Sequence, residues 1–190
     1  MTADDSDNQT DEQIVAQVVA GNTDAFRILF ERYHSKAFGL AFGMTGRTDL
    51  ADDLVQEIFI SVFKGLNGFR SEAKFGTWFY RIATNCSLNF IRRPWWRRGQ
   101  SIDEPEARQV QAVDDIEKEV RIREIQQDVR RALLSLKPHL RAVVVLGDID
   151  GLTHKEIAEA LQLKLGTVES RLHRARKLLA RKLKHLKGQI

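Results

Sequence analysis

At 190 residues the chain can bury one hydrophobic core or two small ones, and its formal net charge of +4 is only mildly basic. Cys86 is the only cysteine, which excludes an intrachain disulfide framework and a cysteine-rich zinc site. The first ten residues contain neither the basic nor the apolar region typical of a signal peptide, so we expect no signal peptide, and no apolar run approaches the roughly 18 residues that a bilayer span requires. We therefore expect a cytoplasmic protein without membrane insertion.

Apolar residues recur at helical spacing through most of the chain, which contains only three prolines. This pattern predicts an all-α protein. We expect a first helix around 14–19, a second that runs from Asp24 to Phe42, and a loop over 43–48. Asp49 is the expected N-cap of a third helix, whose buried stripe is Leu54, Ile58 and Val62.

A long helix is predicted from about Gly76 to Arg93, before Pro94. Beyond it, acidic residues replace the helical pattern, and this change predicts an acidic linker over 99–122. The linker would separate a helical domain at 1–98 from a second at 123–190. Its acids could rest on the basic surfaces of the free protein and suppress DNA binding, which is a hypothesis from charge alone.

The C-terminal domain begins with a helical stripe at 125–136, and Pro138 can start the next helix. Residues 151–177 then read as two short amphipathic helices joined at 164–166, which is the pattern of a helix-turn-helix. Val168, Leu172 and Ala175 would face inward. The outward positions that could contact DNA are Thr167, Glu169, Ser170, Arg171, His173, Arg174 and Lys177.

A charged face of this kind is often only solvated surface. Here no carboxylate follows Glu169, whereas a solvated face normally mixes both signs. The absence of acids therefore favours DNA binding by the last helix.

Aromatic and basic residues are interleaved over 63–98, a combination that suits single-stranded nucleic acid because bases stack on rings while cations follow the backbone. Some of these rings are better explained as core: Trp78, Phe79 and Phe90, together with Ile82. We keep as candidate contacts the loop 68–75 and three residues of the following helix. The set is Phe69, Arg70, Ser71, Glu72, Lys74, Phe75, Tyr80, Arg81 and Asn85.

A third candidate set lies at the start of the third helix and combines carboxylates with groups off the buried stripe, together with Leu54, which would be shared between the stripe and its edge. The set is Asp49, Asp52, Asp53, Leu54, Gln56, Glu57 and Phe59. The carboxylates could form a magnesium or general-base site, as in a nuclease that uses Asp52, Asp53 and Glu57. They could equally be acids at a helix N-terminus with no further role. No phosphate loop, zinc motif or nucleophile elbow is present, so we expect no enzyme, no catalytic residue, no metal and no cofactor.

Three segments together resemble the extracytoplasmic-function (ECF) sigma factors of the sigma-70 family, which are initiation subunits of bacterial RNA polymerase. Residues 52–59, Asp-Asp-Leu-Val-Gln-Glu-Ile-Phe, look like the family's core-binding helix. Residues 69–85 resemble its promoter-melting segment, and 151–177 its C-terminal DNA reader. The resemblance covers nearly the whole chain, in the family's order and spacing.

The resemblance implies two domains and three functional surfaces. The acidic set would bind the clamp coiled-coil of core RNA polymerase. The loop 68–75, with Asn85, would capture a base flipped out of the minus-ten element. Ser170, Arg171 and Arg174 would read the minus-thirty-five element as duplex. Promoter DNA, double-stranded and melted, is thus an implied partner, and an anti-sigma factor is an implied inhibitor.

This sequence departs from the family at two places. Ser71-Glu72-Ala73 stands where the family often has Gly-Asp-Ser, and Glu169 stands where a basic residue is common. A carboxylate at 169 could accept from a cytosine amino group. The alternative to a sigma factor is a conventional helix-turn-helix regulator that binds palindromic duplex as a dimer, although this leaves the aromatic and basic segment unexplained.

Overall fold

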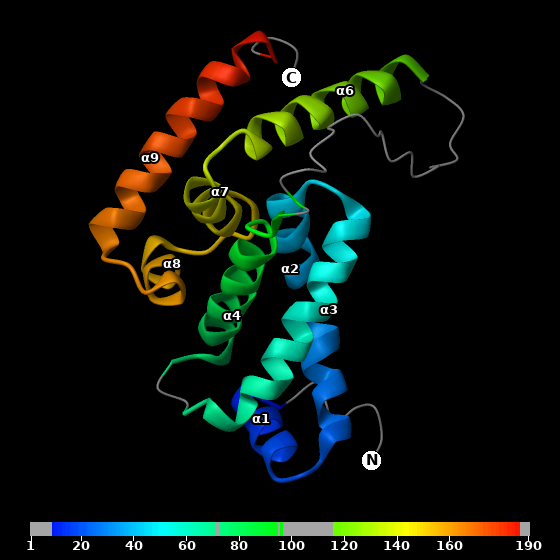
Figure 1. Ribbon diagram of the computed structural model, residues 1–190, viewed down its shortest axis with the longest axis vertical. Helices are drawn as coiled ribbons and strands as arrows, with labels where there is room; N and C mark the ends of the chain where they lie inside the picture. The colour runs from blue at the N-terminus through cyan, green and yellow to red at the C-terminus, as the bar shows by residue number, and fades with distance from the viewer. Residues whose placement is uncertain (1–8, 71–72, 95, 97–115, 187–190) are drawn as a thin grey trace.

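The computed structural model describes residues 9–70, 73–94, 96 and 116–186, with the backbone alone over 116–119. The regular secondary structure in these ranges is entirely helical, as predicted for an all-α chain. Figure 1 shows the helices up to α4 as one bundle and the helices from α6 onward as a second group against it. The predicted linker lies mostly outside the described residues, so the resting place of its acids is not described.

The N-terminal bundle begins with α1 (Asp11–Val19), whose first turn is closed by a capping box. Thr10 Oγ1 accepts from the Gln13 amide at 3.3 Å, and Gln13 Oε1 accepts from the Thr10 amide at 2.9 Å. The short helix η1 (Thr23–Ala25) leads into α2 (Phe26–Thr45). The predicted loop over 43–48 is wrong, because α2 continues to Thr45 and ends only at the left-handed Gly46, with φ of 70°.

The third helix, α3 (Thr48–Gly65), starts one residue before the predicted N-cap. Arg47 holds the cap position, and Asp49 lies inside the first turn. After η2 (Leu66–Gly68), α4 (Phe75–Phe90) completes the bundle. Helices α2, α3 and α4 pack against one another, and their buried faces meet at the Tyr33, Phe59 and Phe79 rings, with centroids 4.6 to 6.1 Å apart.

The C-terminal group consists of α6 (Ile116–Leu134), α7 (Pro138–Val144) and a π-helical turn, η3 (Val145–Ile149), followed by α8 (His154–Leu161), α9 (Leu165–Lys182) and η4 (Lys184–Leu186). Pro138 occupies the first turn of α7, as predicted. The run 143–146 is buried, also as predicted. Helix α7 packs between α9 and the N-terminal bundle, so its apolar residues have neighbours on both sides.

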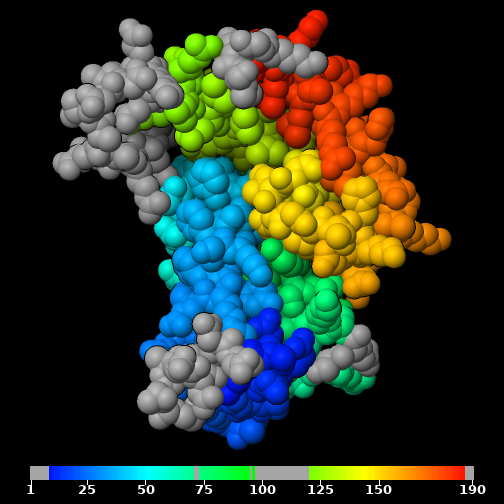
Figure 2. Space-filling model, turned by 180° about the vertical axis from the view of Figure 1, so that it is seen from behind, coloured from blue at the N-terminus to red at the C-terminus, as the bar shows by residue number. Residues whose placement is uncertain are grey.

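The buried residues form one continuous apolar cluster that includes both groups of helices. Figure 2 shows the segment around 145–165 seated directly on α2 and α4. The two groups therefore share a packed interface in this arrangement. The domain limits at 1–98 and 123–190 remain predictions, although helix α6 begins near the expected end of the linker.

Candidate functional site

The helix-turn-helix is formed by α8 and α9. Thr153 caps α8: its Oγ1 accepts from the Glu156 amide at 3.3 Å, and its amide donates to Glu156 Oε2 at 2.8 Å. The hydrogen bond from the Thr153 side chain lowers the pKa of the Glu156 carboxyl. The helices are joined by 162–164 rather than by the predicted 164–166, because Gln162 ends α8 in the left-handed conformation, with φ of 52°, and α9 starts at Leu165.

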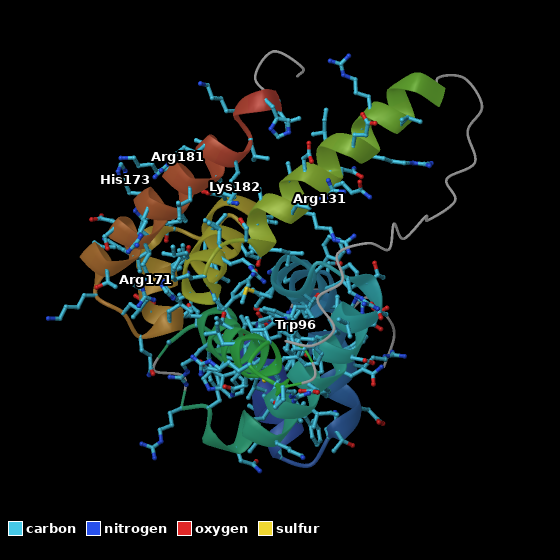
Figure 3. All side chains as sticks on the ribbon, turned by 45° about the horizontal axis from the view of Figure 1, so that its top comes forward. Trp96, Arg131, Arg171, His173, Arg181 and Lys182 are labelled. Atoms are coloured by element: carbon cyan, nitrogen blue, oxygen red, sulfur yellow. The ribbon has the colours of Figure 1, made fainter. Side chains whose placement is uncertain are left out.

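Helix α9 presents one apolar and one polar face, as predicted. Val168, Leu172 and Ala175 are at most 1% exposed. The opposite face contains the seven candidate contacts, of which Thr167 and Arg171 are half-buried and the others exposed. Figure 3 shows labelled basic side chains along the length of this helix. Such a row of donors and cations can contact base edges near its start and phosphates further along.

Two basic residues near this face, His139 on α7 and Arg176 on α9, were not singled out from the sequence. His139, exposed on α7, has its pKa lowered first by partial burial and then by the nearby Arg171, Lys137 and Arg174 charges. The positive potential of the α9 face therefore extends to the start of α7. In the sequence, the run Lys137-Pro138-His139 could have indicated this extension of the basic surface, because two basic residues flank the proline at which α7 starts. In contrast, the Arg176 guanidinium is held by the Asp148 carboxylate through two hydrogen bonds.

The candidate residues of α4 and its preceding loop divide by burial. Trp78, Phe79 and Phe90 are core residues, as the sequence indicated. For Phe75 and Tyr80 the structure corrects the prediction of a nucleic-acid contact, because their side chains are only 1% and 6% exposed. The Phe75 ring packs against Tyr33 at 5.1 Å between centroids, and Tyr80 lies under the segment before α8, where its hydroxyl faces the Asp150 carboxyl.

Other members of that set do reach the surface. Arg70, Lys74 and Asn85 are exposed, and Arg81 is half-buried. The half-buried Phe69 leans edge-on against Trp78, with ring centroids 5.4 Å apart. Ser71 and Glu72 lie outside the described residues.

The acidic set on α3 also divides. Asp52, Asp53 and Gln56 are exposed on one side of the helix. Leu54 and Phe59, which were expected at least partly at its edge, are 0% and 6% exposed. The buried stripe of α3 is wider than a spacing of four predicts, because this helix packs against α2 and α4 at once and thus needs two apolar rows.

Two carboxylates of this set already have partners. Asp49 accepts from the Arg47 guanidinium at 3.1 and 2.6 Å, and this pair lowers the pKa of the Asp49 carboxyl. Glu57 accepts from Arg93 through two bonds of 2.7 Å, which tie α3 to the segment after α4. Among the described residues, no three His, Cys, Asp or Glu side chains gather as metal ligands. None of the helices in those ranges is long and apolar enough to cross a bilayer.

Comparison with known proteins gives two family matches. Residues 29–97 match the family described as Sigma-70 region 2, and residues 126–179 match Sigma-70, region 4. The first match includes the acidic set and the aromatic, basic segment. The second contains the helix-turn-helix. A region 2 match accounts for the segment that a conventional regulator leaves unexplained.

Two curated relatives are named ECF RNA polymerase sigma-E factor. The Haemophilus influenzae protein is 33% identical over 93% of this chain and 97% of its own length. The Escherichia coli K12 protein is 34% identical over 95% of this chain and 98% of its own length.

Solved structures give the same fold. CnrH, in complex with the cytosolic domain of CnrY, aligns with a TM-score of 0.70 and 25% identity over 93% of this chain and 99% of that chain. Bartonella quintana RpoE, in complex with the anti-sigma factor NepR, aligns with a TM-score of 0.62 and 22% identity over 84% of this chain and 96% of that chain. By its two region matches and its near full-length relatives, the chain belongs to the ECF sigma factors of the sigma-70 family.

Proposed function

We propose that this protein directs core RNA polymerase to promoters through three surfaces on three helices. The observation that supports this division is exposure: α3, α4 and α9 each present a different kind of polar side chain to solvent. In this proposal 1–98 is the region 2 domain, 123–190 is the region 4 domain, and 99–122 links them.

The polymerase-docking surface is the exposed side of α3. Asp52, Asp53 and Gln56 present two unshielded carboxylates and an amide, which complement the basic coiled-coil of the clamp. Asp49 and Glu57 contribute less, because each carboxylate is already bound to an arginine of this chain. Leu54 and Phe59 support the helix from within the core.

The minus-ten surface combines the loop before α4 with the exposed part of that helix. Arg70 and Lys74 supply cations for the melted strand, and Asn85 supplies an amide that can bond to a base edge. Flipping a base costs a few kcal/mol, and stacking returns roughly 1–3 kcal/mol per base. Melting in this proposal therefore needs no ATP hydrolysis by this chain, and the polymerase supplies all the chemistry.

The minus-thirty-five surface is the outer face of α9. Ser170 and Arg171 lie in its first half, where a recognition helix reaches base edges, and Arg174 follows about one turn later. Glu169 can accept a hydrogen bond from a cytosine amino group in the major groove, which would favour that base at the contacted position. We further propose that this protein acts in the cytoplasm, where polymerase and promoters are, without a cofactor or metal and under the control of an anti-sigma factor.

The test is run-off transcription with purified bacterial core polymerase on a pool of genomic promoter fragments. We expect start sites that require this protein and disappear with Asp53→Arg. The control Glu31→Arg makes the same charge reversal at an exposed residue of α2, and it should leave transcription intact. Equal loss with both variants would contradict α3 docking. Absence of any start site, together with binding to palindromic duplex, would favour the conventional regulator.

A further inference from the structure

Glu169 is the only acidic residue of α9. It lies about one turn into this helix, where a recognition helix reaches base edges, and its side chain is 55% exposed. In the major groove, phosphates on both strands would repel a carboxylate unless a cation or a base amino group compensates its charge. Duplex binding by α9 therefore favours a partner for Glu169.

The partner that the fold supplies is His154, the first residue of α8. Its Nδ1 atom lies 3.9 Å from Glu169 Oε1, and its side chain is 46% exposed. Helices α8 and α9 pack against each other, so the helix-turn-helix itself sets this distance. Among the residues that the structure describes, no further ion pair or hydrogen bond holds the Glu169 carboxylate. Its Oε2 atom is therefore available to a base.

The His154 and Glu169 side chains border a surface hollow between α8 and α9. The other charged or titratable side chains around it come from α9: His173, Arg176 and Lys177. The Arg176 guanidinium is held by the Asp148 carboxylate through two hydrogen bonds. Glu169 thus supplies the one carboxylate at this hollow, and the charge on the His154 ring decides whether that carboxylate has an ionic partner on α8.

An imidazole changes its charge between about pH 5 and 8, and only its protonated form donates from both ring nitrogens. The first helix of a helix-turn-helix crosses the DNA backbone, and His154 begins that helix. While Nδ1 faces Glu169, Nε2 on the opposite edge of the ring can donate to a phosphate. The protonated ring can therefore bridge the carboxylate and the DNA backbone, and nearby phosphates favour that protonated form.

We propose that His154 is a positioning residue for base recognition: its protonated ring holds Oε1 of Glu169, so that Oε2 accepts a hydrogen bond from the amino group of one cytosine in the minus-thirty-five element. This inference rests on the proposed function of α9. It goes further by making the preference for that base depend on a second helix and on a proton taken up from solvent. A neutral ring leaves the glutamate free to change rotamers, which weakens the preference.

The test uses holoenzyme reconstituted from the full chain and core polymerase. A promoter found by run-off transcription is converted into a library with a randomised minus-thirty-five element and a downstream sequence tag that identifies each template. Base preferences are then ratios within one reaction, which cancel the effect of pH on the polymerase. We expect cytosine to be enriched at one position at about pH 6, and this enrichment to fall about two- to fivefold at about pH 8, because an exposed ion pair contributes little more than that.

Substitutions separate the two residues. Glu169→Ala should lose the cytosine enrichment at both pH values, and the double variant with His154→Ala should equal it, since the histidine acts through the carboxylate. His154→Ala alone should give the weak enrichment at both pH values, whereas His154→Arg, whose charge is permanent, should restore the strong enrichment at the higher pH. The matched control is His185→Ala, which removes another exposed imidazole paired with an acid, Asp128, and should keep the wild-type pH dependence.

Three results would overturn parts of this scheme. Cytosine enrichment that persists in Glu169→Ala would refute the base contact. Enrichment that stays constant between the two pH values in the wild type, or that falls equally in His154→Ala, would refute the role of His154. Absence of start sites on genomic promoter fragments at both pH values would instead contradict the proposed function, and the role of His154 would fall with it.

Discussion

Asp150 makes the stability of the packed arrangement depend on pH. Burial raises the pKa of its carboxyl from 3.8 to about 6, while Tyr80 and the Lys36 charge lower it only in part. Its Oδ2 atom is buried and has no hydrogen-bond partner among the residues that the structure describes. The hollow beside this carboxyl is bordered by charges of both signs, with Glu156 and Asp11 on one hand and Lys36 and Lys74 on the other, so burial is the dominant cause of the raised pKa. Replacement by asparagine removes the charge and retains the shape.

The magnitude follows from the pKa. A rise from 3.8 to about 6 corresponds to at most about 3 kcal/mol at neutral pH, and partial solvation of the carboxyl lowers this to about 1–2 kcal/mol. The packed protein binds the proton more tightly than the unfolded chain does. The packed state is therefore stabilised fully below pH 3.8, and this contribution is lost as the pH rises through about 6.

Urea unfolding of the wild type and Asp150→Asn, followed by far-UV circular dichroism, measures this effect. At neutral pH the variant should be more stable by about 1–2 kcal/mol, because its amide pays no charge-burial cost. The advantage should shrink towards acid pH, where the wild-type carboxyl is protonated. Comparison between the two proteins cancels the titration of shared groups. A difference that stays constant across this pH window would refute the reasoning.

Three further predictions concern single residues. Arg141→Met should lower the free energy of unfolding by about 3–5 kcal/mol in urea, because it leaves buried carbonyls unpaired, whereas the exposed Arg131→Met should change it by less than about 1 kcal/mol. Gln162→Gly should increase the free energy of unfolding by about 0.5–1 kcal/mol and so raise the melting temperature, because glycine adopts the left-handed cap conformation without strain. A lower melting temperature would show that contacts of the Gln162 side chain outweigh this backbone strain. Glu57→Gln should change stability by less than about 1 kcal/mol, since its ion pair with Arg93 is substantially exposed, so a loss of polymerase affinity larger than that would assign Glu57 to docking.

The sequence predicted those features that depend on local periodicity. The helical class, the inward face of α9 and the start of α7 at Pro138 follow from residues close together in the chain, because a helix forms through contacts three and four residues apart. The family resemblance followed from motifs that are also contiguous. Errors at this level were small shifts of helix ends, as at Asp49 and at the 162–164 turn, where the backbone alone decides the boundary.

Burial at the edges of helices depended on the tertiary structure. Phe59 and Phe75 belong to the core because α3 and α4 each have neighbours on more than one side, which no single helical stripe predicts. Arg141 and Asp150 attracted no attention in the sequence, since their environments are made by residues far away in the chain, Met44 and Tyr80. The packing of α8 on α4 has the same origin. It requires glycines of α2 to meet side chains about a hundred positions later, and only the folded chain brings them together.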